Sequence, residues 1–186
     1  MSPANVNLTT MRFDVVLRTF ADFFEREGIR YAVIGGLAMQ AWGASRFTKD
    51  TDIVVTRTDR EAVVHFAESL GFETLFVGPS HSNHLHSNED LGRIDFMYVD
   101  EATAERVFSA ATPKPIVGDV IAPVVSPEHL AMMKGLAMKF APQRIPYEGE
   151  DVRLLLKLPD IDADVVREYF EQQGLLGLFD AIWKAR

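Results

Sequence analysis

Asp50 and Asp52, two aspartates separated by one residue, are the clearest candidates for functional residues in this sequence. They lead directly into the apolar run 53–55, which is rich in strand-forming residues. Alternate side chains of a strand point to the same face, so the two carboxylates can lie together. Carboxylate oxygens are the ligands that hard divalent cations prefer. The pair is therefore a candidate metal site, although an isolated Asp-x-Asp is also common in turns and at strand edges.

A glycine pair, Gly35-Gly36, precedes the aspartates and follows the short apolar run Tyr31–Ile34. The order indicates a strand, a Gly-Gly turn, a short helix and then a second strand. Glycines allow a phosphate to approach the backbone at a helix N-terminus, where free N–H groups and the helix dipole favour an anion. A carboxylate pair that binds metal beside a phosphate site is typical of phosphoryl or nucleotidyl transfer.

The Gly-Gly pair, the spacer and the Asp-x-Asp followed by apolar residues resemble the signature of the DNA polymerase beta-like nucleotidyltransferase superfamily. The segment 46–52, Arg-Phe-Thr-Lys-Asp-Thr-Asp, is similar to its small bacterial branch near the AbiEii-type toxins. That superfamily uses a third carboxylate on a later strand, and Asp95 is the matching residue. The family often has Gly-Ser where this chain has Gly35-Gly36, so a serine contact with phosphate would fall to the Gly36 backbone.

The resemblance implies a two-metal mechanism with Mg²⁺ and a nucleoside triphosphate (NTP). One ion would hold the nucleotide phosphates and the other would activate the acceptor oxygen, with Asp50 and Asp52 as metal ligands. Asp95 would be the base or a ligand of the second ion. An unpaired buried carboxylate is costly, so Asp95 should have a cation or hydrogen-bond donors nearby.

Further residues are candidates for contacts with the nucleotide. Arg46 and Thr48 stand just before the aspartates and either contact phosphate or belong to a solvated loop. By resemblance to AbiEii-like proteins, Lys134 binds the triphosphate, and Asp151 is a site or supporting residue. The alternatives are a surface lysine and an acid that suits a helix N-terminus. Arg144 has a weaker claim, from a basic residue common there in the family.

Three histidines, His81, His84 and His86, have a spacing that invites a zinc interpretation. The chain has no cysteine, and the nearby acids already belong to the other candidate site, so we do not favour zinc. If Ser87 pairs with Gly92 in a tight hairpin, His84 faces Asp95, borders the catalytic acid, and would orient it or contact the acceptor. A bulge would shift this register by one residue.

These side chains need a sheet to bring them together, and the sequence predicts an α+β protein with the nucleotidyltransferase fold. A small mixed sheet should be flanked by helices, with strands 31–34, 52–55 and 93–99 in that one sheet. We expect a catalytic core at 1–125 and a C-terminal helical region at 126–186 that packs on it, because Ser126-Pro127-Glu128 is a strong helix start. The predicted helices are 9–27, 36–42, 60–70, 100–111, 126–140, 148–158, 162–173 and 175–184. The further predicted strands are 72–77, 84–87 and 119–122.

The net charge of −8, without any basic run, argues against strong non-specific binding to nucleic acid. It leaves room for one local basic groove near Arg46, Lys49, Arg57 and Arg60. The first residues do not resemble a signal peptide, and no run approaches the ~20 apolar residues of a membrane span. We therefore expect a cytoplasmic protein that does not enter the membrane.

The predicted reaction is transfer of a nucleoside monophosphate from an NTP to a hydroxyl or phosphate acceptor. A toxin-like enzyme would modify tRNA or a protein and could have an antitoxin partner. An antibiotic-type enzyme would modify a small molecule. The acidic net charge slightly disfavours tRNA. The alternative from another class is a non-catalytic nucleotide-binding module with regulatory function, and the presence of three carboxylates counts against it.

Overall fold

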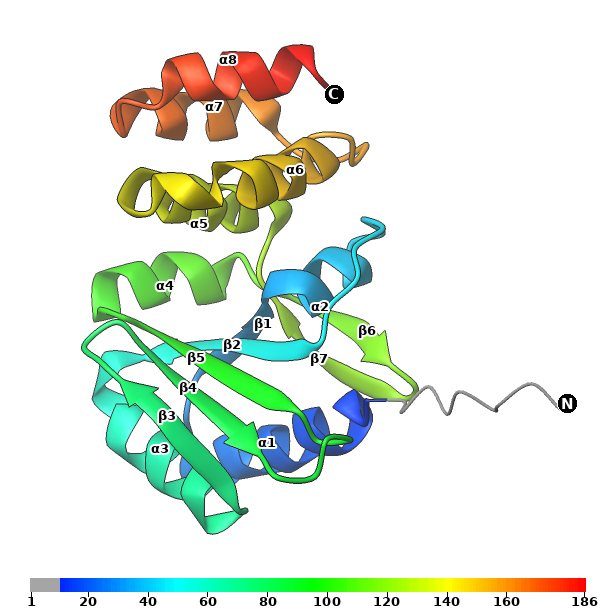
Figure 1. Ribbon diagram of the computed structural model, residues 1–186, viewed down its shortest axis with the longest axis vertical. Helices are drawn as coiled ribbons and strands as arrows, with labels where there is room; N and C mark the ends of the chain where they lie inside the picture. Colours follow the sequence, from blue (N-terminus) through cyan, green and yellow to red (C-terminus); the bar gives the residue numbers. More distant parts are fainter. Residues whose placement is uncertain (1–10) are drawn as a thin grey trace, which may run out of the picture.

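A seven-stranded mixed sheet lies at the centre of the computed structural model, which describes residues 11–186 (Figure 1). The strand order is β3-β4-β5-β2-β1-β7-β6, which confirms the predicted α+β class and sheet. The strands are β1 (Tyr31–Ile34), β2 (Asp50–Thr56), β3 (Phe72–Val77), β4 (His81–His86), β5 (Arg93–Val99), β6 (Thr112–Val117) and β7 (Val120–Val124). The helices are α1 (Phe13–Glu27), α2 (Gly35–Ala41), α3 (Arg60–Ser69), α4 (Glu101–Ser109), α5 (Pro127–Phe140), α6 (Ile145–Leu155), α7 (Ala163–Gln172) and α8 (Leu176–Lys184).

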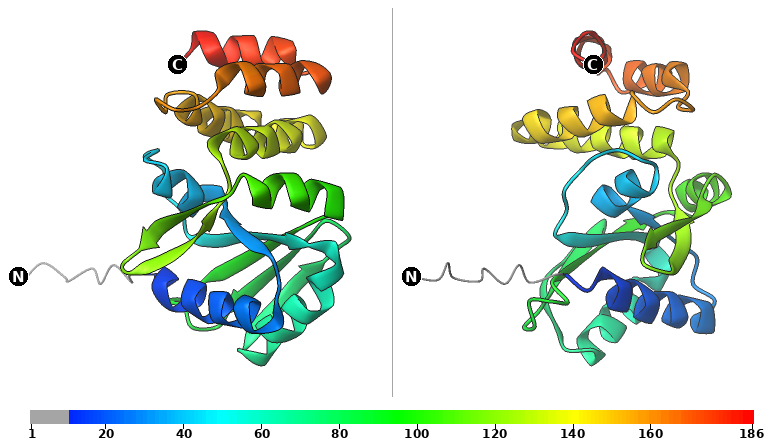
Figure 2. Two further views of the ribbon diagram at one scale, coloured as in Figure 1. Left: turned by 180° about the vertical axis from the view of Figure 1, so that it is seen from behind. Right: turned by 90° about the vertical axis from the view of Figure 1, so that its right-hand side faces the viewer.

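The helices form layers on the two sides of the sheet. Helices α1 and α3 cover one side, and α2 and α4 lie on the other side (Figures 1 and 2). Helices α5 and α6 lie beyond α2 and α4, and α7 and α8 form the outermost layer. The segment between α2 and β2 arches toward α6, so the chain just before Asp50 lies close to the C-terminal helices (Figure 2).

Strand β5 shows how alternation divides the two faces of the sheet. Ile94, Phe96 and Tyr98 are buried, while the residues between them are half-buried. Phe96 packs against Phe20 of α1, with ring centroids 5.4 Å apart. The face of β5 that carries residues 93, 95 and 97 is therefore the face turned away from α1, toward the helices on the other side.

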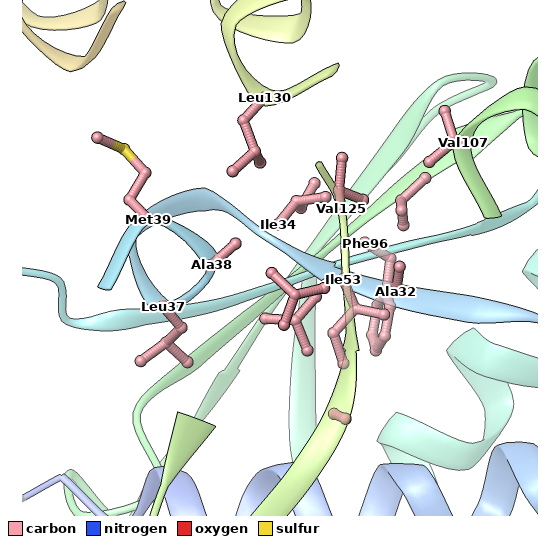
Figure 3. Close-up of a cluster of buried hydrophobic side chains, with 14 of the residues drawn as sticks. Ala32, Ile34, Leu37, Ala38, Met39, Ile53, Phe96, Val107, Val125 and Leu130 are labelled. Carbon is pink, nitrogen blue, oxygen red and sulfur yellow. The ribbon is translucent and has the colours of Figure 1, made fainter. Parts of the chain in front are cut away.

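The C-terminal helices are joined to the sheet through apolar packing. Leu130 of α5 points toward α2 and β1, where Ala38 and Ile34 lie (Figure 3). Helix α5 begins as the sequence predicts, because the Ser126 side chain accepts a hydrogen bond from the His129 backbone N–H and Pro127 is the first helical residue. One cluster of buried apolar side chains includes residues from both sides of position 126. The division at that position stays a prediction.

Several boundaries differ from those predicted. Strand β2 begins at Asp50, and helix α6 begins at Ile145. Strand β6 forms where the sequence predicts only a proline-rich connection, and its position at the edge of the sheet explains why prolines are tolerated there. The first predicted helix begins at Thr9, which lies outside the described residues. None of the helices within residues 11–186 has the length and apolar character needed to cross a membrane.

Candidate active site

Three carboxylates lie on one face of two neighbouring strands. Strands β2 and β5 pair in parallel, with Asp52 directly beside Asp95 and Asp50 beside Arg93. Residues in register on adjacent strands share a face. Asp50, Asp52 and Asp95 accordingly line one cavity of about 540 Å³, a volume within the usual range of ligand sites.

Burial and the neighbouring carboxylates raise the pKa of Asp50 and of Asp52. Burial raises the pKa of Asp52 to about 7, and the neighbouring Asp95 and Asp50 charges act in the same direction. Burial and the Asp95 charge also raise the pKa of Asp50. Neighbouring carboxylates that are partly buried favour their protonated, neutral form unless a cation binds to them. A hard cation such as Mg²⁺ prefers carboxylate oxygens as ligands, and its charge would offset the repulsion among the three aspartates.

The present geometry gives Asp95 a different cationic partner. The Arg93 Nε donates a hydrogen bond to Asp95 Oδ1 over 2.7 Å. Among residues 11–186, no group of three or more acidic, histidine or cysteine side chains is arranged closely enough to hold a metal ion. A metal held jointly by the three aspartates would therefore require their side chains to move closer together than they are here.

Glycine is required at positions 35 and 36 because the side chains of Asp52 and Thr48 lie very close to the backbone there. Gly35 has φ of +64°, and a Cβ on it would lie 2.0 Å from Asp52 Oδ2. A Cβ on Gly36 would lie 2.5 Å from Thr48 Cβ. Any side chain at either position would displace a residue of the cavity. Both glycines line the cavity, so their backbone forms part of its wall.

Arg46 and Thr48 also line the cavity, from the segment before β2. The Thr48 hydroxyl donates a hydrogen bond to the Asp50 backbone carbonyl over 3.2 Å, which holds the segment at the start of β2. Arg46 Nε donates to Asp151 Oδ1 over 2.7 Å, although the two residues are far apart in the sequence. This ion pair joins the segment before β2 to helix α6.

Lys134 lies at the centre of a charge network between α5 and α6. Its Nζ is 2.7 Å from Glu148 Oε2 and 2.7 Å from Asp151 Oδ2. The side chains of Glu148 and Asp151 are only 4% and 6% exposed. Arg144 forms an ion pair with Glu148, one turn along the chain. Three cations, with Arg46 included, thus share two nearly buried acids.

Members of this network have different positions relative to the cavity. Lys134, Arg144 and Glu148 line it, whereas Asp151 is not a lining residue and forms ion pairs with Arg46 and Lys134. Sequence reasoning missed Glu148. The sequence does contain a signal for it: Arg144, Glu148 and Asp151 follow one another at intervals of four and three residues. Residues with that spacing lie on one face of a helix, which indicates that Glu148 accompanies the other two.

The predicted role of His84 beside Asp95 is wrong. The β4–β5 hairpin pairs Asn83 with Asp95 and His84 with Ile94, one residue away from the predicted register. The connection spans residues 87–92 and ends at Gly92 with φ of +61°, and His86 pairs with Gly92 through its backbone N–H. His84 therefore points to the buried face, where it is hydrogen-bonded to Thr74 and Ser82.

No family model matches this chain, and no curated protein sequence does. Solved structures with the same fold are nucleotidyltransferases, so the chain has the nucleotidyltransferase fold that its sequence predicts. One is the lincosamide antibiotic adenylyltransferase LnuA with lincomycin bound, at TM-score 0.57 and 17% identity over 80% of this chain and 99% of that one.

Two further similar structures are those of an antibiotic-resistance factor and of a CCA-adding enzyme. The antibiotic-resistance factor ANT(2'')-Ia has a TM-score of 0.64 and 15% identity, with 92% of both chains covered. A CCA-adding enzyme in complex with ATP has a TM-score of 0.50 and 14% identity, over 88% of this chain and 44% of that one. At these identities the likeness shows the fold alone. The resemblance to AbiEii-type toxins stays a prediction.

Proposed function

We propose that this protein transfers a nucleoside monophosphate from an NTP to a hydroxyl or phosphate acceptor. The observation that carries the proposal is the pairing of Asp52 with Asp95, which sets three carboxylates on the wall of a cavity also lined by Gly35 and Lys134. Nucleotidyltransferases that share the fold support the reaction class.

Each residue of the site would have a distinct task. Asp50 and Asp52 would hold Mg²⁺, which when bound neutralises phosphate charge and lowers the pKa of the acceptor hydroxyl. Asp95 would accept the proton of that hydroxyl as its oxygen bonds to the α-phosphorus and pyrophosphate leaves. The phosphates would bind the side chains of Arg46, Thr48 and Lys134 and the backbone of Gly35 and Gly36. Asp151 would position Arg46 and Lys134.

The acceptor can belong to several classes within the same chemistry. Among the similar structures, LnuA was solved with lincomycin and ANT(2'')-Ia with adenylyl-2''-tobramycin. A toxin-like enzyme with an RNA or protein acceptor, and with an antitoxin partner, is the hypothesis that follows from the sequence resemblance.

One observation favours a second candidate function. In the Arg93–Asp95 ion pair, the Asp95 carboxylate is occupied by a guanidinium. A metal-dependent enzyme needs that carboxylate free. A nucleotide-binding module without turnover would retain that ion pair in its working state.

Transfer of label separates the two functions. The protein would be incubated with each α-labelled NTP and Mg²⁺ in a cell lysate, beside Asp95→Asn as the matched control. Label that reaches an acceptor with the wild-type protein and not with the variant supports the enzyme. If the NTP binds but no acceptor takes label, and Mg²⁺ does not alter the melting temperature, the binding module is the better account.

A further inference from the structure

Asn83 is the residue of β4 that stands beside the proposed base. Strand β4 pairs Asn83 with Asp95, and β5 in turn pairs Asp95 with Asp52 of β2. Directly paired residues share a face of the sheet, and in an antiparallel pair such as β4–β5 their Cβ atoms are roughly 4.5–5.5 Å apart. Asp52, Asp95 and Asn83 therefore form one row across the sheet, with Asn83 on the side of Asp95 away from β2.

The neighbours of Asn83 along β4 determine the direction of its side chain. Ser82 and His84 are fully buried and hydrogen-bonded to each other. The His84 ring packs against Phe96, which is on the face of the sheet that α1 covers. Alternate residues of a strand point to opposite faces, so Asn83 projects toward the face that carries Asp95.

The amide of Asn83 is not committed to another role. Asparagine is depleted in strands, yet this one is half-buried in the middle of β4. Side-chain hydrogen bonds nearby join His84 to Thr74 and Ser82 and join Arg93 to Asp95, and within the described residues none involves the Asn83 side chain. Arg93 donates to Asp95 Oδ1, so Oδ2 remains for a second donor.

A neutral amide suits this position chemically. Three carboxylates and the Arg93 guanidinium already lie together here, and a further charge would alter the attraction for a cation. An amide N–H can hold one oxygen of Asp95 while the other oxygen faces the acceptor, without adding charge. Groups just outside a metal site often orient its carboxylates in this way. Asn83 does not line the cavity, so its effect on the reaction is exerted through Asp95.

We propose that Asn83 is a positioning residue for the base, whose Nδ2 donates a hydrogen bond to Asp95 Oδ2 and holds the carboxylate toward the acceptor hydroxyl. The inference rests on the proposed nucleotidyl transfer, in which Asp95 accepts the proton of that hydroxyl. Hydrogen bonds of a catalytic base are often long without substrate and tighten when it binds. Asn83 thus has the place that the sequence suggested for His84, one residue along the strand.

Turnover and nucleotide binding should respond differently to loss of the amide. Asn83→Ala should lower kcat about 10-fold, the lower end for loss of a group that orients a carboxylate of the site. It should leave KM for NTP unchanged, because Asp95 acts on the acceptor and not on the nucleotide. Asn83→Gln keeps an amide donor and should recover much of the loss, whereas Asn83→Leu has no donor and should not. Transfer of label from the NTP to its acceptor measures both constants.

A double-mutant cycle distinguishes positioning from a structural role. In the Asp95→Asn background, Asn83→Ala should lower kcat no further, because a residue that acts through Asp95 then has no base to position. A structural role would give the same loss in both backgrounds. Equal losses in the two backgrounds, or wild-type kcat in Asn83→Ala, would overturn the proposal.

Metal binding tests the placement of Asn83 without any turnover. Asn83→Asp keeps the side-chain shape and puts a fourth carboxylate beside Asp95, so the Kd for Mg²⁺, measured from melting temperature, should fall at least ~5-fold. Asn88→Asp is the matched control, because it lies in the connection between β4 and β5 and keeps the oxygen that accepts the Asp90 backbone N–H. It should leave Kd unchanged. Equal Kd values in the two variants would contradict the placement.

The outcomes separate this inference from the proposed function. A wild-type protein that transfers label, together with an equally active Asn83→Ala, rejects the role of Asn83 alone. A wild-type protein that binds Mg²⁺ and NTP but transfers label to no acceptor rejects the proposed function, and with it the role of Asn83.

Discussion

Arg93 and Asp95 project from the same face of β5, and Arg93 Nε donates a hydrogen bond to Asp95 Oδ1 over 2.7 Å. Across the sheet, Arg93 also stands beside Asp50. Arg93 thus bonds the proposed base, Asp95, and is the register neighbour of Asp50, a proposed Mg²⁺ ligand, so its positive charge opposes the binding of a metal ion there.

Removal of Arg93 should strengthen metal binding. Arg93→Ala should lower the Kd for Mg²⁺ about 5-fold or more, because the three aspartates then lose a nearby positive charge that opposes the metal ion. Without metal the variant should melt lower by an amount that corresponds to about 1 kcal/mol or less, since the Arg93 side chain is 37% exposed. Melting with and without Mg²⁺ measures both effects, with Arg93→Lys as the charge-preserving control. An unchanged Mg²⁺ affinity in Arg93→Ala would contradict this effect of the Arg93 charge.

Asp52 should make the metal-free protein less stable as pH rises. Its pKa is raised to about 7 in the folded protein, first by burial. Between the unfolded value near 4 and 7, the folded state binds more protons than the unfolded state, so the free energy of unfolding falls as pH increases. Asp52→Asn should remove this dependence and be more stable than wild type at pH 8 by on the order of 1 kcal/mol. Urea unfolding in EDTA at pH 5 and pH 8 provides the measurement, and parallel curves for both proteins would refute the assignment.

Removal of a carboxylate should cost turnover rather than nucleotide binding. Asp50→Asn, Asp52→Asn and Asp95→Asn keep the side-chain shape, and each should lower kcat at least ~10²-fold, the scale of one general-base or electrostatic contribution. Nucleotide transfer at saturating NTP measures this loss. Asp59→Asn, which alters an acid outside the cavity, is a suitable control. Wild-type kcat in any of the three variants would remove that residue from the mechanism.

Lys134 should affect both the nucleotide and the fold. Lys134→Ala should raise KM for NTP more than it lowers kcat, because a phosphate contact exists in both the ground state and the transition state. It should also destabilise the protein by about 3–5 kcal/mol, since Glu148 and Asp151 are nearly buried and share this cation. Lys134→Ala combined with Glu148→Gln should recover part of the stability without recovering KM. Lys139→Ala, with an exposed side chain, serves as the control.

His84 should matter for stability and not for catalysis. His84→Ala should leave kcat and KM unchanged but destabilise the protein by roughly 1–3 kcal/mol, because Thr74 and Ser82 lose their buried partner. Burial lowers the pKa of His84 in the folded protein, so its contribution is present above the unfolded value near 6.5 and is lost as pH falls below it. Unfolding at pH 7.5 and pH 5.5 tests this, with exposed His81→Ala as control. A loss of kcat would restore His84 to the site.

The sequence predicts the elements around the site well, because short-range patterns determine them. The apolar runs at 31–34 and 53–55, the glycine pair and the Ser-Pro-Glu helix start all act within a few residues, and the structure has an element at each. Gly35 illustrates why. Its positive φ and its contact with Asp52 are requirements that no other residue type meets.

Relationships between distant segments could not be obtained in the same way. The His84 register depended on one residue in a hairpin connection, and such a shift reverses the face of every side chain. The Arg46–Asp151 ion pair joins two segments that are far apart in the chain, and no local sequence pattern links them. Nothing in the sequence near Arg93 distinguishes it from an ordinary strand residue. Its position beside Asp50 follows from the parallel alignment of β2 and β5.

That alignment also determines when the site can exist as the chain is made. Strand β2 has β1 beside it early, but its neighbour on the other side is β5, which follows only after α3, β3 and β4. Closing so long a loop costs chain entropy before any of its contacts form. A nascent chain that ends before residue 93 carries Asp50 and Asp52 without Asp95 or Arg93. The ribosome must therefore release β5 before Asp50, Asp52 and Asp95 can lie on one face of the sheet.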